Sequence, residues 1–92
     1  MSQFSNTIPI SIVLCVRNEE LRIEQSLRFI QDLDVDEIII VDGGSEDTTW
    51  RFGKSFSGAK WIQAGNVGLL KQRLLGIKES RNSILLLLDV DD

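Results

Sequence analysis

The chain has 92 residues, of which 42% are hydrophobic and 26% charged, and its formal net charge is -4. This composition is typical of one soluble globular domain over residues 1–92, and it excludes a disordered chain or a disulfide framework, because there is one cysteine. The acidic balance argues against nucleic acid as a partner, since phosphate backbones are bound by clustered Lys and Arg.

Targeting and membrane signals are lacking in the sequence. The first eight residues have neither the basic nor the apolar region of a signal peptide, and the longest apolar run, Ile84 to Leu88, is too short to cross a bilayer. We therefore expect a cytoplasmic protein, with the inner face of a membrane as the alternative location. Cys15 lies inside an apolar run, which favours a reduced, buried thiol over a reactive one.

The first predicted strand is Ile10 to Val16, a nearly continuous apolar run that follows the chain's one proline. Runs this rich in Ile and Val are typical of strands buried on both faces. Asn18 is the predicted N-cap of a helix that ends near Asp32. The face of this helix that we expect to be buried carries Ile23, Leu27 and Ile30.

The second predicted strand is Glu37 to Val41, which is followed by Asp42 and by a glycine pair at 43–44 that allows a tight turn. Ser45 is the predicted N-cap of the next helix, which we expect to end by Gly58. The side chains that share one face of that helix are Thr49, Phe52 and Phe56.

The last part of the chain contains a strand, a helix and a second strand. Lys60 to Gln63 is a short third strand, and Asn66 to Glu79 is the third predicted helix. Gly76 is expected to let this helix approach the sheet closely. The fourth strand, Ile84 to Leu88, is apolar enough to be buried on both faces, and it leads directly into the acidic cluster of residues 89–92. The side chains of the third helix that we expect to point inward are Leu70, Leu74 and Ile77.

The alternation of four strands with three helices predicts parallel βαβ units. We therefore expect an α/β, Rossmann-like fold with a mostly parallel sheet and helices on both faces. Ligands of such open sheets bind beyond the carboxyl ends of the strands. The polar residues at those ends are Arg17, Asn18 and Glu19 after the first strand, Asp42 after the second, and Asp89 and Asp91 after the fourth.

Asp89 and Asp91 flank Val90, so in an extended segment their side chains leave the same face and could share a ligand or a cation. The chain has no histidine, and hard oxygen donors suit Mg²⁺ or Mn²⁺ better than zinc. Such an ion would also hold a diphosphate. The alternative is a solvated acidic strand end, which is the commoner fate of an isolated D-x-D pattern.

Two interpretations stay open for the other polar residues. Asp42 either accepts backbone N–H groups of its own turn or accepts a base N–H or a ribose hydroxyl in the crevice. Arg17 and Glu19 either belong to a solvated helix start or contact a nucleotide. Lys71 and Arg73 either form an exposed basic helix face or contact the same ligand.

With these residues in view, the chain resembles the family-2 glycosyltransferases of the GT-A fold from about Ile10 to Asp92. The stretches that match in order and spacing are Val13 to Glu20, Ile39 to Thr49, Asn66 to Leu69 with Arg73 and Gly76, and Leu87 to Asp92. The resemblance implies a nucleotide-diphospho-sugar donor, UDP-, GDP- or dTDP-linked, whose sugar is transferred to an acceptor hydroxyl. It further implies a metal-assisted reaction that inverts the anomeric centre.

The resemblance also implies site residues. In it, Asp42 would receive the base, Asp89 would face the ribose or the uridine-like moiety, and Asp91 would ligate the metal together with Asp89, with Asp92 assisting. The residues expected to bind the nucleotide are Cys15, Arg17, Glu19, Asp42, Gly68, Arg73, Asp89, Val90 and Asp91.

Three positions depart from the family's pattern. Cys15 stands where a proline is common, and Arg17 stands where a tyrosine often stacks on the base. Leu74 stands where an asparagine usually follows the arginine. These departures leave the identity of the base open and make Arg73 a less secure nucleotide contact.

The resemblance assigns no catalytic residue to this chain, because in the family the acceptor-binding half that supplies the catalytic base follows the D-x-D strand. We therefore expect residues 1–92 to bind nucleotide without turnover. The alternative is a non-catalytic module, truncated or completed by a second chain, since a strand as apolar as Ile84 to Leu88 needs cover. That alternative predicts self-association or a partner chain that completes the sheet.

Overall fold

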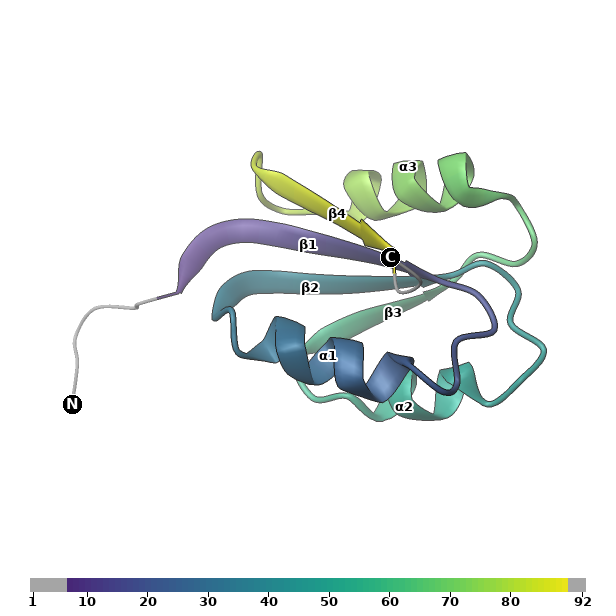
Figure 1. The fold of residues 1–92 in the computed structure, drawn as a ribbon. Helices are drawn as coiled ribbons and strands as arrows, with labels where there is room; N and C mark the ends of the chain where they lie inside the picture. The colour runs from purple at the N-terminus through teal and green to yellow at the C-terminus, as the bar shows by residue number, and fades with distance from the viewer. Residues whose placement is uncertain (1–6, 90–92) are drawn as a thin grey trace.

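The computed structural model describes residues 7–89, which form alternating strands and helices around one sheet (Figure 1). Within this range all the strands are parallel and their order is β3-β2-β1-β4. This arrangement confirms the predicted α/β, Rossmann-like fold with four strands and three helices. The elements are β1 (Ile8–Val16), α1 (Ile23–Gln31), β2 (Val35–Asp42), α2 (Thr49–Ser55), β3 (Ala59–Gln63), α3 (Leu69–Glu79) and β4 (Leu85–Asp89).

Helices cover both faces of the sheet, because alternate residues of the apolar strands point to opposite sides. Figure 1 shows α1 and α2 on one side of the strands and α3 on the other. The layer under α1 and α2 contains Ile12, Leu14, Val16, Ile38 and Ile40, together with Ile23, Leu27 and Ile30 of α1. The layer under α3 contains Val13, Cys15, Ile39 and Val41. The predicted inward faces of α1 and α2 are confirmed, since Thr49 is buried and Phe52 and Phe56 pack on the first layer.

Both predicted N-caps are wrong. α1 begins at Ile23 and α2 at Thr49, several residues later than caps at Asn18 and Ser45 would require. Asn18 instead adopts a φ of 53°, and its Oδ1 accepts the N–H of Glu46 at 2.7 Å. The Ser45 hydroxyl accepts the N–H of Asn18 at 2.9 Å. These side chains bind one loop to the other, and that pairing takes precedence over capping their own helices.

The predicted inward face of α3 is also wrong. Leu70 is 71% exposed, and Leu74 and Ile77 are exposed as well. The buried positions are Gln72 and Gly76, which lie one turn apart on the same side of the helix. The close approach predicted for Gly76 is confirmed, because a Cβ there would lie 2.2 Å from a methyl carbon of Val13. α3 therefore contacts the sheet through Gln72, Gly76 and the partly buried Leu75, and not through Leu70 or Leu74.

β4 is an edge strand, and the expectation that it is buried on both faces is wrong. It pairs with β1 from Ser11↔Leu85 to Cys15↔Asp89. Its leucines at 86 and 87 are exposed, as is Ile84 just before the strand. That another chain or segment covers this edge of the sheet stays a prediction.

The direction of winding reverses at β1. The chain runs from β1 through β2 to β3 with α1 and α2 on one face, and then returns by way of α3 on the other face to β4. In open α/β sheets this reversal leaves a crevice beyond the carboxyl ends of the two strands on either side of it, here β1 and β4. No helix within residues 7–89 is long and apolar enough to span a bilayer.

Candidate functional site

A crevice of about 450 Å³ opens at the carboxyl ends of β1 and β4, where the winding reverses. Its walls come from the end of β1 and the following loop, the turn after β2, the loop before α3 and the last residue of β4. The residues that line it are Cys15, Val16, Arg17, Glu19, Gly43, Asn66, Gly68, Leu69, Gln72 and Asp89.

The crevice gathers most of the site residues that the sequence predicts. Cys15, Arg17, Glu19, Gly68 and Asp89 all line it, although they come from separate stretches of the chain. Arg73 does not line the crevice itself but forms an ion pair with Asp89, which does. Asp42 precedes the turn at Gly43 and does not line the crevice either. Val90, Asp91 and Asp92 lie outside the described residues.

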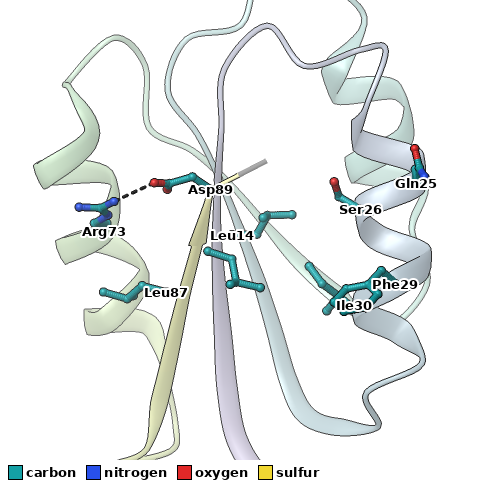
Figure 2. Close-up of a pocket in the computed structure, with 9 residues that line it drawn as sticks. Leu14, Gln25, Ser26, Phe29, Ile30, Arg73, Leu87 and Asp89 are labelled. Carbon is teal, nitrogen blue, oxygen red and sulfur yellow. Dashed lines mark hydrogen bonds and ion pairs between the residues drawn. The ribbon is translucent and has the colours of Figure 1, made fainter. Parts of the chain in front are cut away.

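Arg73 and Asp89 form an ion pair that joins α3 to the end of β4 (Figure 2). Nη2 of Arg73 lies 2.8 Å from Oδ2 of Asp89, whose side chain is 16% exposed. The other carboxylate oxygen, Oδ1, and Nε of Arg73 are buried and have no hydrogen-bond partner among residues 7–89. Within the described residues, Asp89 therefore has one carboxylate oxygen without a hydrogen-bond partner.

The sequence of this chain also matches a known family. The model of glycosyl transferase family 2 covers residues 11–92, which is all but the first ten residues. The chain belongs to glycosyl transferase family 2. Members of this family bind nucleotide-sugar donors. A comparison with curated proteins finds no match.

Asp42 of this family 2 domain is held within its own turn. Its side chain accepts the N–H of Ser45 at 3.1 Å, the hydroxyl of Ser45, and Nε2 of Gln63 at 3.2 Å. The residue is 1% exposed and does not line the crevice. The structure thus contains the turn contact that one interpretation predicted, and the role of Asp42 as an acceptor for the base stays a prediction.

Cys15 is a buried, free thiol, as the sequence predicted. Burial raises its pKa to about 11, and the negative charge of Asp89 beside it acts in the same direction, against the opposing effect of Arg73. At neutral pH the thiol is therefore protonated, and it lines the crevice as a small apolar group and not as a nucleophile.

The rim of the crevice is held by hydrogen bonds between the loop after β1 and the loop after β2. The N–H of Glu19 donates to the Thr49 hydroxyl at 2.8 Å, and the N–H of Glu20 donates to Asp47 at 3.2 Å. Burial alone would raise the pKa of Asp47, yet the hydrogen bonds from Thr49 and Glu20 lower it, so Asp47 stays charged. This pairing fixes the backbone that carries Arg17 and Glu19.

The family 2 domain contains one crevice residue that the sequence did not single out. Gln72 is 5% exposed, and its Nε2 donates to the carbonyl oxygens of Val16 at 3.2 Å and Val41 at 3.0 Å. The sequence feature that could have identified Gln72 is its position one turn before Gly76, on the face where the helix comes closest to the sheet. Lys71 on the same helix is exposed, so the exposed basic face that was one interpretation of the pair applies to Lys71 and not to Arg73.

The carboxylates predicted to ligate a metal are Asp89, at the end of β4, and Asp91. Among residues 7–89 no three acidic, histidine or cysteine side chains lie close enough to hold an ion. Asp89 provides a free, buried oxygen at the crevice, and Asp91 follows it beyond the described range. The described donors are hard oxygens, which is the chemistry that Mg²⁺ and Mn²⁺ require.

Proposed function

We propose that this chain forms the donor site of a glycosyltransferase. In this proposal a nucleotide-diphospho-sugar, UDP-, GDP- or dTDP-linked, binds in the crevice of about 450 Å³, and its sugar passes to an acceptor hydroxyl with inversion. The observation that supports it is the convergence of Arg17, Glu19 and Asp89 at the winding reversal of a family 2 domain. A crevice of this volume lies within the range of roughly 300–1,000 Å³ that small-molecule sites occupy.

The charges at the crevice suit a nucleotide. Arg17 is exposed at the end of β1 and supplies positive charge for the phosphates. Glu19 supplies carboxylate oxygens that accept hydrogen bonds from ribose hydroxyls. Arg73 holds Asp89 from the side of α3 and so fixes the direction of its free oxygen.

We propose Mg²⁺ or Mn²⁺ as the cofactor, with Asp91 and Asp89 as its ligands. The support is the buried, unpartnered Oδ1 of Asp89, which needs a positive partner, and the second carboxylate two residues later. Bound there, the ion would neutralise charge that develops on the departing diphosphate. Arg73 keeps the Oδ2 atom occupied, so Oδ1 is the atom left for the ion.

Residues 1–92 alone are proposed to bind the donor without transferring its sugar. None of the side chains at the crevice is assigned as the base that deprotonates the acceptor, a role that the family's acceptor-binding half supplies. Incubation of the chain with a donor and a set of acceptor alcohols is expected to give no product above the rate of hydrolysis. Measurable sugar transfer would refute this part of the proposal.

Calorimetric titration tests the donor site directly. UDP, GDP and dTDP are titrated into the chain with and without Mn²⁺, and into the variants Asp91→Ala and Asp32→Ala. Asp32 is an exposed carboxylate at the end of α1, so its removal controls for a change in net charge. We expect one of the nucleotides to bind only with Mn²⁺, and Asp91→Ala to weaken that binding at least roughly tenfold, which corresponds to about 1.4 kcal/mol.

The outcomes separate the parts of the proposal. Binding that ignores both Mn²⁺ and Asp91→Ala would refute the metal site alone. The lack of binding by all three nucleotides would refute the donor site. An equal loss in Asp32→Ala would show that net charge, and not the proposed ligand, is responsible.

A second function is favoured by the open edge of β4. A groove of about 490 Å³ runs between α1 and β4, where Figure 2 shows Phe29 and Ile30 of α1 on the side of Leu14, and Leu87 on the opposite side of β4, toward α3. Exposed apolar edge strands tend to pair with other chains. We propose, as the alternative, a module that self-associates or is completed by a second chain through β4.

Sedimentation velocity tests this alternative over a range of concentrations. We expect a concentration-dependent dimer or larger species in the wild-type chain, and its dissociation by Leu87→Lys, which places a charge on the exposed edge. A sharp monomer at all concentrations, with fully cooperative unfolding, would contradict it.

A further inference from the structure

A buried amide lies at the floor of the crevice, and none of the roles above uses it. Gln72 projects from the middle of α3 toward the sheet and is 5% exposed. Buried glutamines are uncommon because the amide must replace every hydrogen bond that it made to water. The contacts of this side chain therefore indicate what it is placed to do.

The two amide protons of Gln72 are both engaged. Nε2 donates to the carbonyl oxygen of Val16 at 3.2 Å and to that of Val41 at 3.0 Å, which are at the carboxyl ends of β1 and β2. Both partners are acceptors, so the amino group must be the branch that faces them, and this fixes the orientation of the amide. Oε1 consequently occupies the opposite branch.

Oε1 of Gln72 is left as an acceptor at the crevice. No group within residues 7–89 donates a hydrogen bond to it, and Gln72 is one of the residues that line the crevice. Gly43, which also lines the crevice, leaves room for the amide, because a Cβ at that position would lie 2.5 Å from Oε1. The crevice thus contains an amide oxygen that can accept a hydrogen bond but not donate one, on an amide whose orientation is fixed by its two donated hydrogen bonds.

We propose that Oε1 of Gln72 accepts a hydrogen bond from the ring N–H of the nucleobase, which makes Gln72 a specificity-determining residue of the donor site. Uracil, thymine and guanine carry an N–H at the centre of their pairing edge, whereas cytosine and adenine carry a lone pair there. A lone pair against Oε1 is repelled and leaves the oxygen without a partner, so the site discriminates against cytosine and adenine. This inference rests on the proposed donor site, whose UDP-, GDP- and dTDP-linked donors all carry such an N–H. It gives Gln72 the acceptor role that the resemblance implies for Asp42, a residue that is buried and bound to Ser45 and Gln63.

Ligand changes test this without disturbing the protein. UDP, N3-methyl-UDP, 2′-deoxy-UDP and CDP are titrated by calorimetry, with Mn²⁺, into the wild-type chain. The loss of one hydrogen bond to a buried acceptor corresponds to roughly a tenfold loss of affinity. We expect N3-methylation and the replacement of uracil by cytosine each to weaken binding by about that factor.

Variants of Gln72 then attribute the effect to its oxygen. Gln72→Met removes both functions of the amide, and Gln72→Lys keeps a donor for the two carbonyls while removing the acceptor. Gln31→Met changes an exposed glutamine on α1 and is the matched control. We expect UDP and N3-methyl-UDP to bind within about threefold of each other in both Gln72 variants, and to keep their tenfold difference in the control.

Each other result overturns the proposal. An N3-methyl penalty that is the same in wild type and in the Gln72 variants would mean that the amide only ties β1 to β2. A penalty for 2′-deoxy-UDP that disappears with Gln72 would assign the oxygen to the ribose and not to the base. If the wild-type chain binds none of the diphosphates, the donor site itself fails and this inference fails with it.

Discussion

Gly76 sets the distance between α3 and the sheet, so the substitution Gly76→Ala probes how the domain is packed. An added Cβ would lie 2.2 Å from one methyl carbon of Val13 and 3.1 Å from the other. Ordinary carbon–carbon contacts are roughly 3.5–4.0 Å, so the helix would have to move by about 1.5 Å or Val13 would have to leave its position. Val13 is fully buried between the strands and α3, which leaves it little room.

Two opposing effects decide how much Gly76→Ala changes the free energy of unfolding. Overpacking of a dense core costs about 1–3 kcal/mol. Replacing glycine by alanine inside a helix returns up to about 1 kcal/mol through helix propensity. With the full return, we therefore expect Gly76→Ala to lower the free energy of unfolding by up to about 2 kcal/mol, and each kcal/mol lowers the melting temperature of a domain of this size by roughly 4–8 °C.

Urea unfolding followed by circular dichroism measures this change. Lys71→Ala, at an exposed position of the same helix, is the control and should be nearly neutral. The double variant Val13→Ala with Gly76→Ala should be more stable than the sum of the single effects predicts, because the smaller side chain makes room for the new methyl group. If Gly76→Ala stabilises the domain by the full propensity gain, the close approach of α3 is wrong.

Three further predictions follow from the polar contacts. Arg73→Met should lower the free energy of unfolding by about 1 kcal/mol. This is at the low end for a hydrogen bond to a charged group, because the arginine side chain is 36% exposed. An unchanged urea midpoint would contradict the pairing with Asp89. The hydrogen bond from Arg81 lowers the pKa of Asp36 in the folded protein from its ordinary 3.8. Ionised Asp36 therefore stabilises the fold above pH 3.8, and this contribution is lost as the pH falls through the lowered pKa of the folded state. Asp36→Asn should therefore remove part of the acid dependence of the melting temperature, and an unaltered pH profile would refute this. The Cys15 thiol, whose pKa is raised to about 11 by burial, should react with a disulfide reagent at pH 8 only as fast as the domain opens, whereas rapid labelling in the folded state would contradict its burial.

The sheet and one helix face could be predicted because their signals are local. The runs Ile10 to Val16 and Glu37 to Val41 are continuous and β-branched, and both are buried central strands in the structure. On α1 the apolar residues Ile23, Leu27 and Ile30 recur at helical spacing with polar residues between them, so one face alone could be buried. Pattern and tertiary structure agree at these positions, which is why the fold class followed from the sequence.

The helix starts and the face of α3 could not be predicted, because residues far away in the chain decide them. Asn18 and Ser45 resemble N-caps locally, yet each finds a partner in the other loop, 27 residues away in the case of the Asn18 N–H and the Ser45 hydroxyl. On α3 the leucines at 70 and 74 show helical spacing, but Gly76 allows the opposite face to come closer to the sheet. Hydrophobic periodicity does not predict how close a helix comes to a sheet. In α3 that distance decides which face of the helix is buried.

The position of the crevice followed from the sheet rule, since polar residues at the carboxyl ends of parallel strands meet at one edge. Arg17, Glu19 and Asp89 were found in this way. Asp42 satisfies the same rule but is drawn into its turn by Ser45 and Gln63, which are contacts that its position after a strand does not predict.

Stability and the candidate site are joined through α3, and this has a testable consequence. Gly76 fixes the height of the helix, and Gln72, one turn earlier on the same face, forms the crevice floor. Gly76→Ala should therefore weaken nucleotide binding several-fold as well as stability, because an outward shift withdraws the amide from the strand ends. Asp36→Asn, near the amino ends of β2 and β4, should lower stability and leave the affinity of the folded domain unchanged. Calorimetry well below both melting temperatures compares the two variants. An equal loss of affinity in both would show that the binding defect follows from general destabilisation and not from the position of Gln72.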